Sequence, residues 1–406
     1  VANTNPAKRD VSHPLTSLAL SLLSHFSPLT SHFYKKRMTE TSKTSELPRR
    51  YNRLYANYIR SFAAISVIFI HSTGTYLPDF DPANSMDARW WTGNIYCSLL
   101  RWATPFFIML SGSFLLDPSR PESTGQFLRK RIVRVLLPFA FWTVVYMVYQ
   151  YRLSLFSSGT ELPRASEVLY KIFFEDVYYH LWFVPMIVSL YLLTPTFRIF
   201  IQHAQRRDIE YFLVVAFSIT AIQHLIPGFF IFEYVGWLGY IGFYVLGYYL
   251  GTYSLPQPWR KILYALALLM PAVTALGTWW LSLQKGAHDQ TLFIYFSPNV
   301  VFMTTALFSW LRWYDWSAFA DRFPGFDRWI QQFSGLSFGV YFIHALVLDI
   351  LKNGYIGQWH TTSELFFNRP VNPLIGAIPQ AILVLLISYG CVYLLSKLPG
   401  SKKWLM

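Results

Sequence analysis

Charged residues are scarce in this chain. They make up 14% of its 406 residues, whereas soluble domains carry about 25%. Cysteine is scarce too: Cys97 and Cys391 lie in separate apolar segments, so we expect neither a structural disulfide nor a cysteine metal site. The sequence also lacks zinc-finger spacing, a helix-turn-helix context and any basic-aromatic patch outside its apolar blocks, which argues against nucleic-acid binding.

Apolar residues, by contrast, form 53% of the chain, and aromatic residues form 19%. They are grouped in blocks of roughly 20 residues, the length that spans a bilayer as a helix. The predicted fold class is therefore all-α, a polytopic membrane protein with the lipid bilayer as its surroundings. We expect about ten transmembrane helices, over roughly 54–74, 92–116, 130–150, 179–201, 210–227, 231–252, 260–282, 291–313, 333–352 and 371–396.

The net charge of +13 fits this interpretation, because lysine and arginine collect in the cytoplasmic loops of membrane proteins. Basic residues do gather before the first predicted span and in alternate loops after it. Both termini are therefore predicted to be cytoplasmic, which agrees with an even number of spans. The basic positions that set this orientation are Arg49, Arg50, Arg53, Arg129, Lys130, Arg131, Arg134, Arg198, Arg206, Arg207, Arg260, Lys261, Lys397, Lys402 and Lys403.

The chain divides into one membrane domain and two short flanks. Residues 1–50 are rich in Ser, Thr, Lys and Arg and are predicted to be disordered. Met38 is the first methionine, and we expect the native chain to begin there. Residues 51–400 are predicted to form a single transmembrane domain, and residues 401–406 a short basic cytoplasmic tail.

The first predicted span, "ANYIRSFAAISVIFIHSTG", contains both an arginine and a histidine. Arg60 and His71 are eleven residues apart, which places them on one helix face and roughly 16 Å apart along the axis. Asn57 shares that face. Charged groups inside a membrane usually face the protein interior or water. The alternative is that Arg60 reaches the inner interface and His71 is a satisfied interfacial histidine.

Further arginines lie near the predicted cytoplasmic side. Arg131 and Arg134 are three residues apart at the entry to the third span, where paired guanidinium groups suit a phosphate-bearing ligand. The same pair could equally be a cytoplasmic anchor of the helix. Arg101 lies in the middle of the second predicted span, a depth at which an anchoring role is harder to accept.

A second set of polar residues is predicted for the outer side. Carboxylates accept hydrogen bonds from hydroxyl groups, and aromatic rings offer flat faces, so such a set suits a sugar. Part of it could simply be an interfacial aromatic belt. A histidine that titrates near neutral pH can deprotonate a hydroxyl or carry an acyl group, and no metal is expected. The candidate acceptor-side or supporting residues are Asn57, Glu175, Asp176, His180, Trp182 and His344.

These motifs, in this order, resemble the acyltransferase 3 family of integral membrane acyltransferases over about residues 54–395. Arg60 and His71 match the family's Arg-x10-His signature, with Asn57 where many members carry Asp. Arg131 and Arg134 match its Arg-x-x-Arg motif. Further likenesses are "WATPFFIMLSGSFLL", "YYHLWFVPMIVSLYLLTP", "YIGFYVLGYYLG" and "LSFGVYFIHALVL".

The resemblance implies an enzyme of a bacterial inner membrane with ten spans. It would move an acyl group, usually acetyl, from cytosolic acyl-coenzyme A to a hydroxyl of a cell-envelope glycan or its lipid-linked precursor. His71 would be catalytic with Arg60 in support, and Arg131 and Arg134 would bind the donor, joined by Arg101. The segments "HLWF" and "FIYFSPNVVFMTTALFSWL" resemble an O-acetyltransferase branch of the family.

Two alternatives have different chemistry. A transporter or flippase of a lipid-linked sugar would also need intramembrane charges, although the sequence shows no repeated halves of the kind that many transporters have. A sensory or scaffolding protein would use the same polar groups only for helix packing. Tolerance of His71→Ala would favour the scaffold.

Overall fold

The computed structural model describes residues 49–119, 122–152, 164–226, 236–353, 355–356, 359–360, 372–401 and 404. The predictions for residues 1–48, including a start at Met38, lie outside these residues. Most of the basic tail lies outside them as well.

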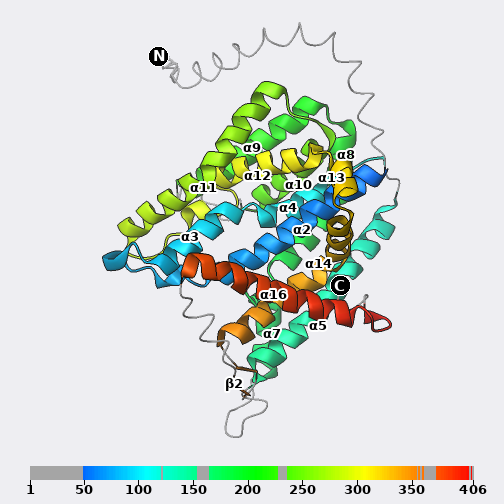
Figure 1. Cartoon of the computed structure of the whole chain (residues 1–406). Coiled ribbons are helices and arrows are strands. Elements are labelled where there is room, and N and C mark those ends of the chain that lie inside the picture. The colour runs from blue at the N-terminus through cyan, green and yellow to red at the C-terminus, as the bar shows by residue number, and fades with distance from the viewer. Residues whose placement is uncertain are drawn as a thin grey trace, which may run out of the picture. The chain divides into compact units, whose positions relative to one another are not determined.

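The described chain is built from helices, as predicted (Figure 1). Eight helices in it are long and apolar enough to cross a membrane, two of them together with an adjoining 3-10 turn. They are α2 (Arg49–Gly74), α5 (Thr124–Gln150), α8 (Phe183–His203), α9 (Arg206–Leu225), α11 (Gln257–Lys285), α12 (Pro298–Trp313), α14 (Pro324–Asn353) and α16 (Pro373–Leu395).

Of the two remaining predicted spans, one differs from the expectation. The continuous span predicted over 92–116 is wrong: the chain forms α3 (Ala88–Leu100) and α4 (Ala103–Leu115), with a break at Arg101 and Trp102. Pro105 explains the break, because proline lacks the N–H that would bond to the carbonyl four residues back, at Arg101. Of the span predicted over 231–252, residues 236–252 form α10 (Gly236–Thr252), a helix of 17 residues, and residues 231–235 lie outside the described residues. The total of ten spans and the orientation of the termini stay predictions.

Several short elements connect the long helices. They were not predicted from the sequence: α7 (Ala165–Phe174), α13 (Trp316–Arg322), the 3-10 turns η2 (Leu77–Asp79), η3 (Pro82–Asn84) and η5 (Thr291–Phe293), and the antiparallel two-residue strands β1 (Tyr355–Ile356) and β2 (Trp359–His360). In addition, α14 begins at Pro324 rather than at residue 333.

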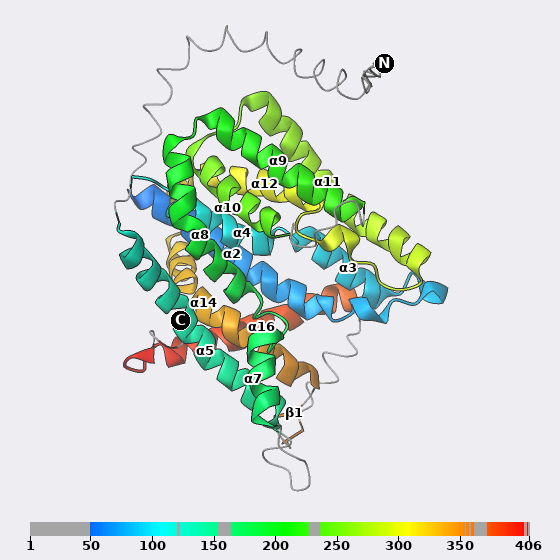
Figure 2. The same ribbon diagram turned by 180° about the vertical axis from the view of Figure 1, so that it is seen from behind.

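Helices α2 and α14 are the most buried of these eight helices. In their most apolar stretches 56% and 61% of residues are buried, against 17% in α11 and 22% in α9. Figures 1 and 2 both show α2 between α14 and α16 on one side and α4 and α10 on the other. The two helices run in the same direction, because Tyr58 bonds to Asp327 near their beginnings and His71 bonds to His344 much further along.

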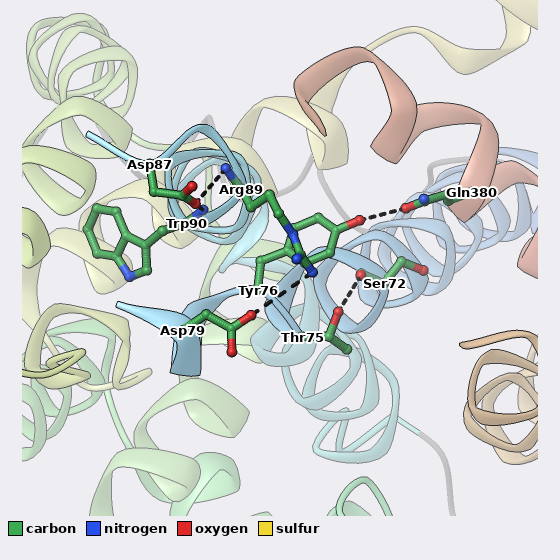
Figure 3. A network of polar contacts seen from close by, with 8 residues as sticks. All are labelled: Ser72, Thr75, Tyr76, Asp79, Asp87, Arg89, Trp90 and Gln380. Atoms are coloured by element: carbon green, nitrogen blue, oxygen red, sulfur yellow. Dashed lines mark hydrogen bonds and ion pairs between the residues drawn. The ribbon is translucent and has the colours of Figure 1, made fainter. Parts of the chain in front are cut away.

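A polar network fixes the end of α2 that carries His71 (Figure 3). The Tyr76 hydroxyl donates to Gln380 Oε1 on α16 at 2.8 Å. The guanidinium of Arg89 lies 5.0 Å from the centre of the Tyr76 ring and 4.0 Å from Asp79 Oδ2. Asp87 caps α3 by accepting from the backbone N–H of Arg89. Three helices are thereby joined directly beyond His71.

Helices α4 and α10 approach each other so closely that glycine is required at their contact. A Cβ atom on Gly112 would overlap the backbone oxygen of Tyr244, and one on Gly247 would overlap that of Met109. Small residues at such positions allow helix backbones to pack tightly inside a membrane.

We expect Gly112→Ala and Gly247→Ala each to lower the free energy of unfolding by roughly 1–3 kcal/mol, because the added methyl group forces the two backbones apart. Thermal unfolding in detergent, followed by size-exclusion chromatography, measures this loss. Gly390→Ala is the matched control, since no atom lies within 4 Å of a Cβ at that position of α16. Equal unfolding midpoints for all three variants would show that the close contact is absent.

Candidate active site

Two imidazole rings meet where α2 and α14 pass each other. His71 Nδ1 lies 2.7 Å from His344 Nε2, and the rings stack with their centres 5.0 Å apart. The second nitrogen of His344, Nδ1, lies 2.6 Å from the backbone oxygen of Tyr341. His344 is fully buried, whereas His71 is partly exposed. The sequence offered both histidines as candidates but gave no reason to pair them.

His180 completes a histidine cluster, which we define as His71, His180 and His344. It precedes α8, is 2% exposed and lies edge-on to His344 with ring centres 5.2 Å apart. Neither of its ring nitrogens makes a hydrogen bond of normal geometry to a described residue. Tyr179 packs edge-on against His71 at 5.1 Å and is 50% exposed. Tyr179 is therefore an exposed aromatic neighbour of His71.

Arg60 lies at the other end of the contact between α2 and α14. Its Nη1 donates to Ser334 Oγ at 3.1 Å, and that hydroxyl donates to Asn57 Oδ1 at 3.0 Å. Arg60, Asn57 and His71 thus all contact α14, as their shared helix face predicted.

Two of the three predicted donor arginines, Arg131 and Arg134, lie in the same region as Arg60. The positive charges of Arg60, Arg131 and Arg134 all act on Tyr191 of α8, and we call these three the arginine cluster. Arg134 is exposed and Arg131 half-buried, with a buried Nε that has no hydrogen-bond partner. Within the described residues, none of the three forms an ion pair with a carboxylate. The cluster therefore carries positive charge that no described acidic side chain neutralises.

Arg101 belongs to the opposite group. It lies at the break between α3 and α4, where its Nε donates to the backbone oxygen of Phe293. Its guanidinium lies 5.0 Å from the centre of the Tyr295 ring, and its charge acts on His71. The sequence predicted Arg101 to join the donor arginines, whereas in the structure Arg101 contacts Phe293 and Tyr295.

The other acceptor-side candidates differ in where they lie relative to Arg101 and the histidine cluster. Trp182 stacks on Tyr295 with ring centres 6.1 Å apart, next to Arg101. Glu175 and Asp176 are exposed directly after α7. No hydrogen bond or ion pair between described residues joins either carboxylate to the histidine cluster.

Several tyrosines near these residues were not predicted from the sequence. Tyr191 lies near all three residues of the arginine cluster. The backbone oxygen of Tyr341 accepts the hydrogen bond from His344 Nδ1. The hydroxyl of Tyr146 on α5 donates to the backbone oxygen of Phe342 and accepts from the backbone N–H of Leu346. For Tyr146, the sequence signal that could have been used is a hydroxyl in the middle of an apolar helix, because a buried tyrosine hydroxyl usually requires a hydrogen-bond partner.

This arrangement suits proton or acyl transfer at an imidazole. One ring nitrogen of His71 is bonded to His344, and the side chain remains partly accessible. Such an imidazole can accept a proton from a hydroxyl group or react with an acyl donor. In the part of the chain that the structure describes, no group of three His, Cys, Asp or Glu residues is placed to hold a metal ion.

Comparison with known proteins gives one family and one relative. A family model described as an acyltransferase domain matches residues 53–397. The chain is 22% identical over 338 residues to "Putative membrane-bound acyltransferase YfiQ" of Bacillus subtilis (strain 168), an alignment that covers 79% of this chain and 84% of that protein. No solved structure matches the chain.

We expect Ser334→Ala to lower the free energy of unfolding by about 1–3 kcal/mol, because Arg60 and Asn57 both lose a partner inside the bundle. The thermal unfolding midpoint of the purified protein measures the effect. Ser189→Ala is the control, since the bond of the Ser189 hydroxyl among the described residues stays within α8, to the backbone oxygen of Pro185. Identical midpoints for the two variants would contradict a structural role for the Ser334 hydroxyl.

Proposed function

The chain belongs to the acyltransferase family and is a multi-pass membrane acyltransferase, and we propose that it is an O-acyltransferase for a cell-envelope glycan. The donor would be acyl-coenzyme A, with acetyl as the first acyl group to test. The acceptor would be a hydroxyl of the glycan or of its lipid-linked precursor, and the location a bacterial inner membrane.

One observation carries this proposal: a single face of α2 leads from the arginine cluster to the histidine pair. Arg60 contacts α14 through Ser334, and His71 contacts the same helix through His344. The eleven residues between them correspond to roughly 16 Å along the helix. An extended donor could therefore be bound by its charged end at one level while its acyl group reacts at the other.

The arginine cluster suits the phosphate groups of coenzyme A. Guanidinium groups bind phosphate through paired, charge-assisted hydrogen bonds, and Arg131 keeps a buried Nε without a partner. The positive-inside rule places Arg131 and Arg134 at the cytoplasmic end, where coenzyme A is available. The slender pantetheine arm would then extend along α2 toward His71.

The histidine end suits an acceptor with hydroxyl groups. Tyr179 is half-exposed beside His71, and Trp182 and Tyr295 present stacked rings near Arg101. Aromatic faces of this kind can pack against sugar rings. The likeness of "HLWF" and of residues 293–311 to the O-acetyltransferase of enterobacterial common antigen makes that glycan the first acceptor to test.

A transporter or flippase of a lipid-linked sugar is the alternative, and the break between α3 and α4 is the feature in its favour, because transporters use interrupted helices at their binding sites. Pro105 already accounts for this break, however. Formation of an acylated glycan from acyl-coenzyme A distinguishes the two functions, since a transporter forms no new covalent bond.

We expect purified protein in lipid vesicles to move radiolabelled acetyl from acetyl-coenzyme A to an envelope glycan extract. His71→Ala should lower the rate at least about 100-fold, because it removes the group that transfers the proton or the acyl unit. Labelled product is measured after separation from the donor. Transfer that continues unchanged in folded His71→Ala would rule out the catalytic assignment.

Arg134→Ala should raise the KM for acetyl-coenzyme A about 10- to 100-fold, the effect of losing one or two charge-assisted hydrogen bonds. Arg129→Ala removes the same charge from an exposed position on α5 outside the arginine cluster, so its KM should stay near that of the parent. Equal KM values for both variants would mean that only net charge matters at this end.

A further inference from the structure

The histidine pair contains a directional chain of hydrogen bonds. The backbone oxygen of Tyr341 can only accept a hydrogen bond, so His344 must donate to it from Nδ1. In a neutral imidazole the other nitrogen carries a lone pair, and Nε2 of His344 therefore accepts. His71 must then donate from Nδ1 across the 2.7 Å contact. The proton on His71 is thereby placed on Nδ1, and its Nε2 keeps a free lone pair.

Burial supports a neutral His344. The side chain is 0% exposed, and no described carboxylate forms an ion pair with it. A charged imidazolium there would be buried without compensation, which is costly. The chain of donors and acceptors consequently has one direction, from His71 through His344 to the backbone of α14.

Tyr146 and Tyr341 hold His344 in place. The Tyr146 hydroxyl donates to the carbonyl of Phe342 at 2.6 Å and accepts from the N–H of Leu346 at 3.1 Å, which bridges the turn of α14 on which His344 lies. A side chain inserted into a helical hydrogen-bond ladder in this way fixes the local geometry of the helix. The Tyr341 hydroxyl also donates to the backbone oxygen of His180 at 2.5 Å.

We propose that His344 is a positioning residue that holds His71 in the tautomer with a proton on Nδ1, so that Nε2 is the reacting nitrogen. This inference rests on the proposed function. In direct transfer, the acceptor hydroxyl gives its proton to His71 Nε2 while its oxygen bonds to the acyl carbon. The carbon–sulfur bond of the thioester breaks, and the leaving thiolate takes that proton back from Nε2.

His344 assists this step without reacting itself. While His71 carries both protons, its Nδ1–H remains donated to His344 Nε2, which stabilises the positive charge. The route through an acyl-histidine also requires an unprotonated Nε2 on His71, because that nitrogen would attack the acyl carbon. In either route His71 would react poorly in the opposite tautomer.

Two amide variants separate this role from a general need for a polar residue. Glutamine at position 344 reaches about as far as Nε2 and can accept from His71, whereas asparagine reaches only to the level of Nδ1. We expect His344→Gln to keep kcat within about 10-fold of the parent and His344→Asn to lose about 100-fold or more, the scale of a mispositioned general base. The KM for acetyl-coenzyme A should change by less than about 3-fold in both.

The kinetic control is His203→Gln. His203 is exposed at the end of α8, and its one side-chain hydrogen bond to a described residue is to the carbonyl of Ile199 in its own helix, so this variant should behave like the parent. Thermal unfolding midpoints establish that each variant is folded. Equal kcat values for folded His344→Gln and His344→Asn, whether high or low, would overturn the proposal.

A spectroscopic measurement tests the tautomer without any substrate. Nitrogen-15 NMR of histidine-labelled protein in bilayers should show His71 with a protonated Nδ1 and an unprotonated Nε2, assigned by comparison with His71→Asn. His344→Asn should bring in signal from the opposite tautomer. A protonated Nε2 in the neutral parent would overturn the proposal.

The proposed function and the tautomer can fail separately. If the parent protein transferred no acyl group to any glycan, the proposed function would fail. The nitrogen-15 spectrum would still decide the tautomer of His71.

Discussion

An arginine or histidine side chain inside a membrane bundle needs a polar partner, and the parallel contact between α2 and α14 supplies such partners along most of its length. Ser61 donates to the carbonyl of Ile330 at 3.2 Å, Arg60 bonds to Ser334, and His71 bonds to His344. Without this contact, each of these groups would be left in apolar surroundings at a considerable cost in free energy. The same contact aligns the arginine with the histidine.

The surrounding helices hold α2 and α14 in register. Gly112 and Gly247 let α4 and α10 approach closely on one side. On the other, Tyr76 ties the end of α2 to α16 through Gln380, and Tyr146 of α5 bridges the turn that carries His344. These contacts come from helices distant in sequence. Close packing and buried hydrogen bonds therefore combine to set the position of one imidazole ring.

The polar residues divide into two groups with different chemistry. The arginine cluster has no described carboxylate as a counter-charge, which is the condition in which guanidinium groups bind an anionic ligand well. The histidine cluster is enclosed by tyrosines, and only His71 within it is partly exposed. This division matches a reaction in which a charged donor is held at one level and its acyl group reacts at another.

The sequence by itself determined the helical membrane class, most of the spans and the shared face of Arg60, Asn57 and His71, because length and periodicity are properties of single helices. It also identified every member of the histidine cluster as a candidate. Only the tertiary structure paired His71 with His344, placed Arg101 against Phe293 and Tyr295, and brought Tyr191 to the arginine cluster. Periodicity states which residues share a face of one helix, whereas the packing of distant helices decides what that face meets.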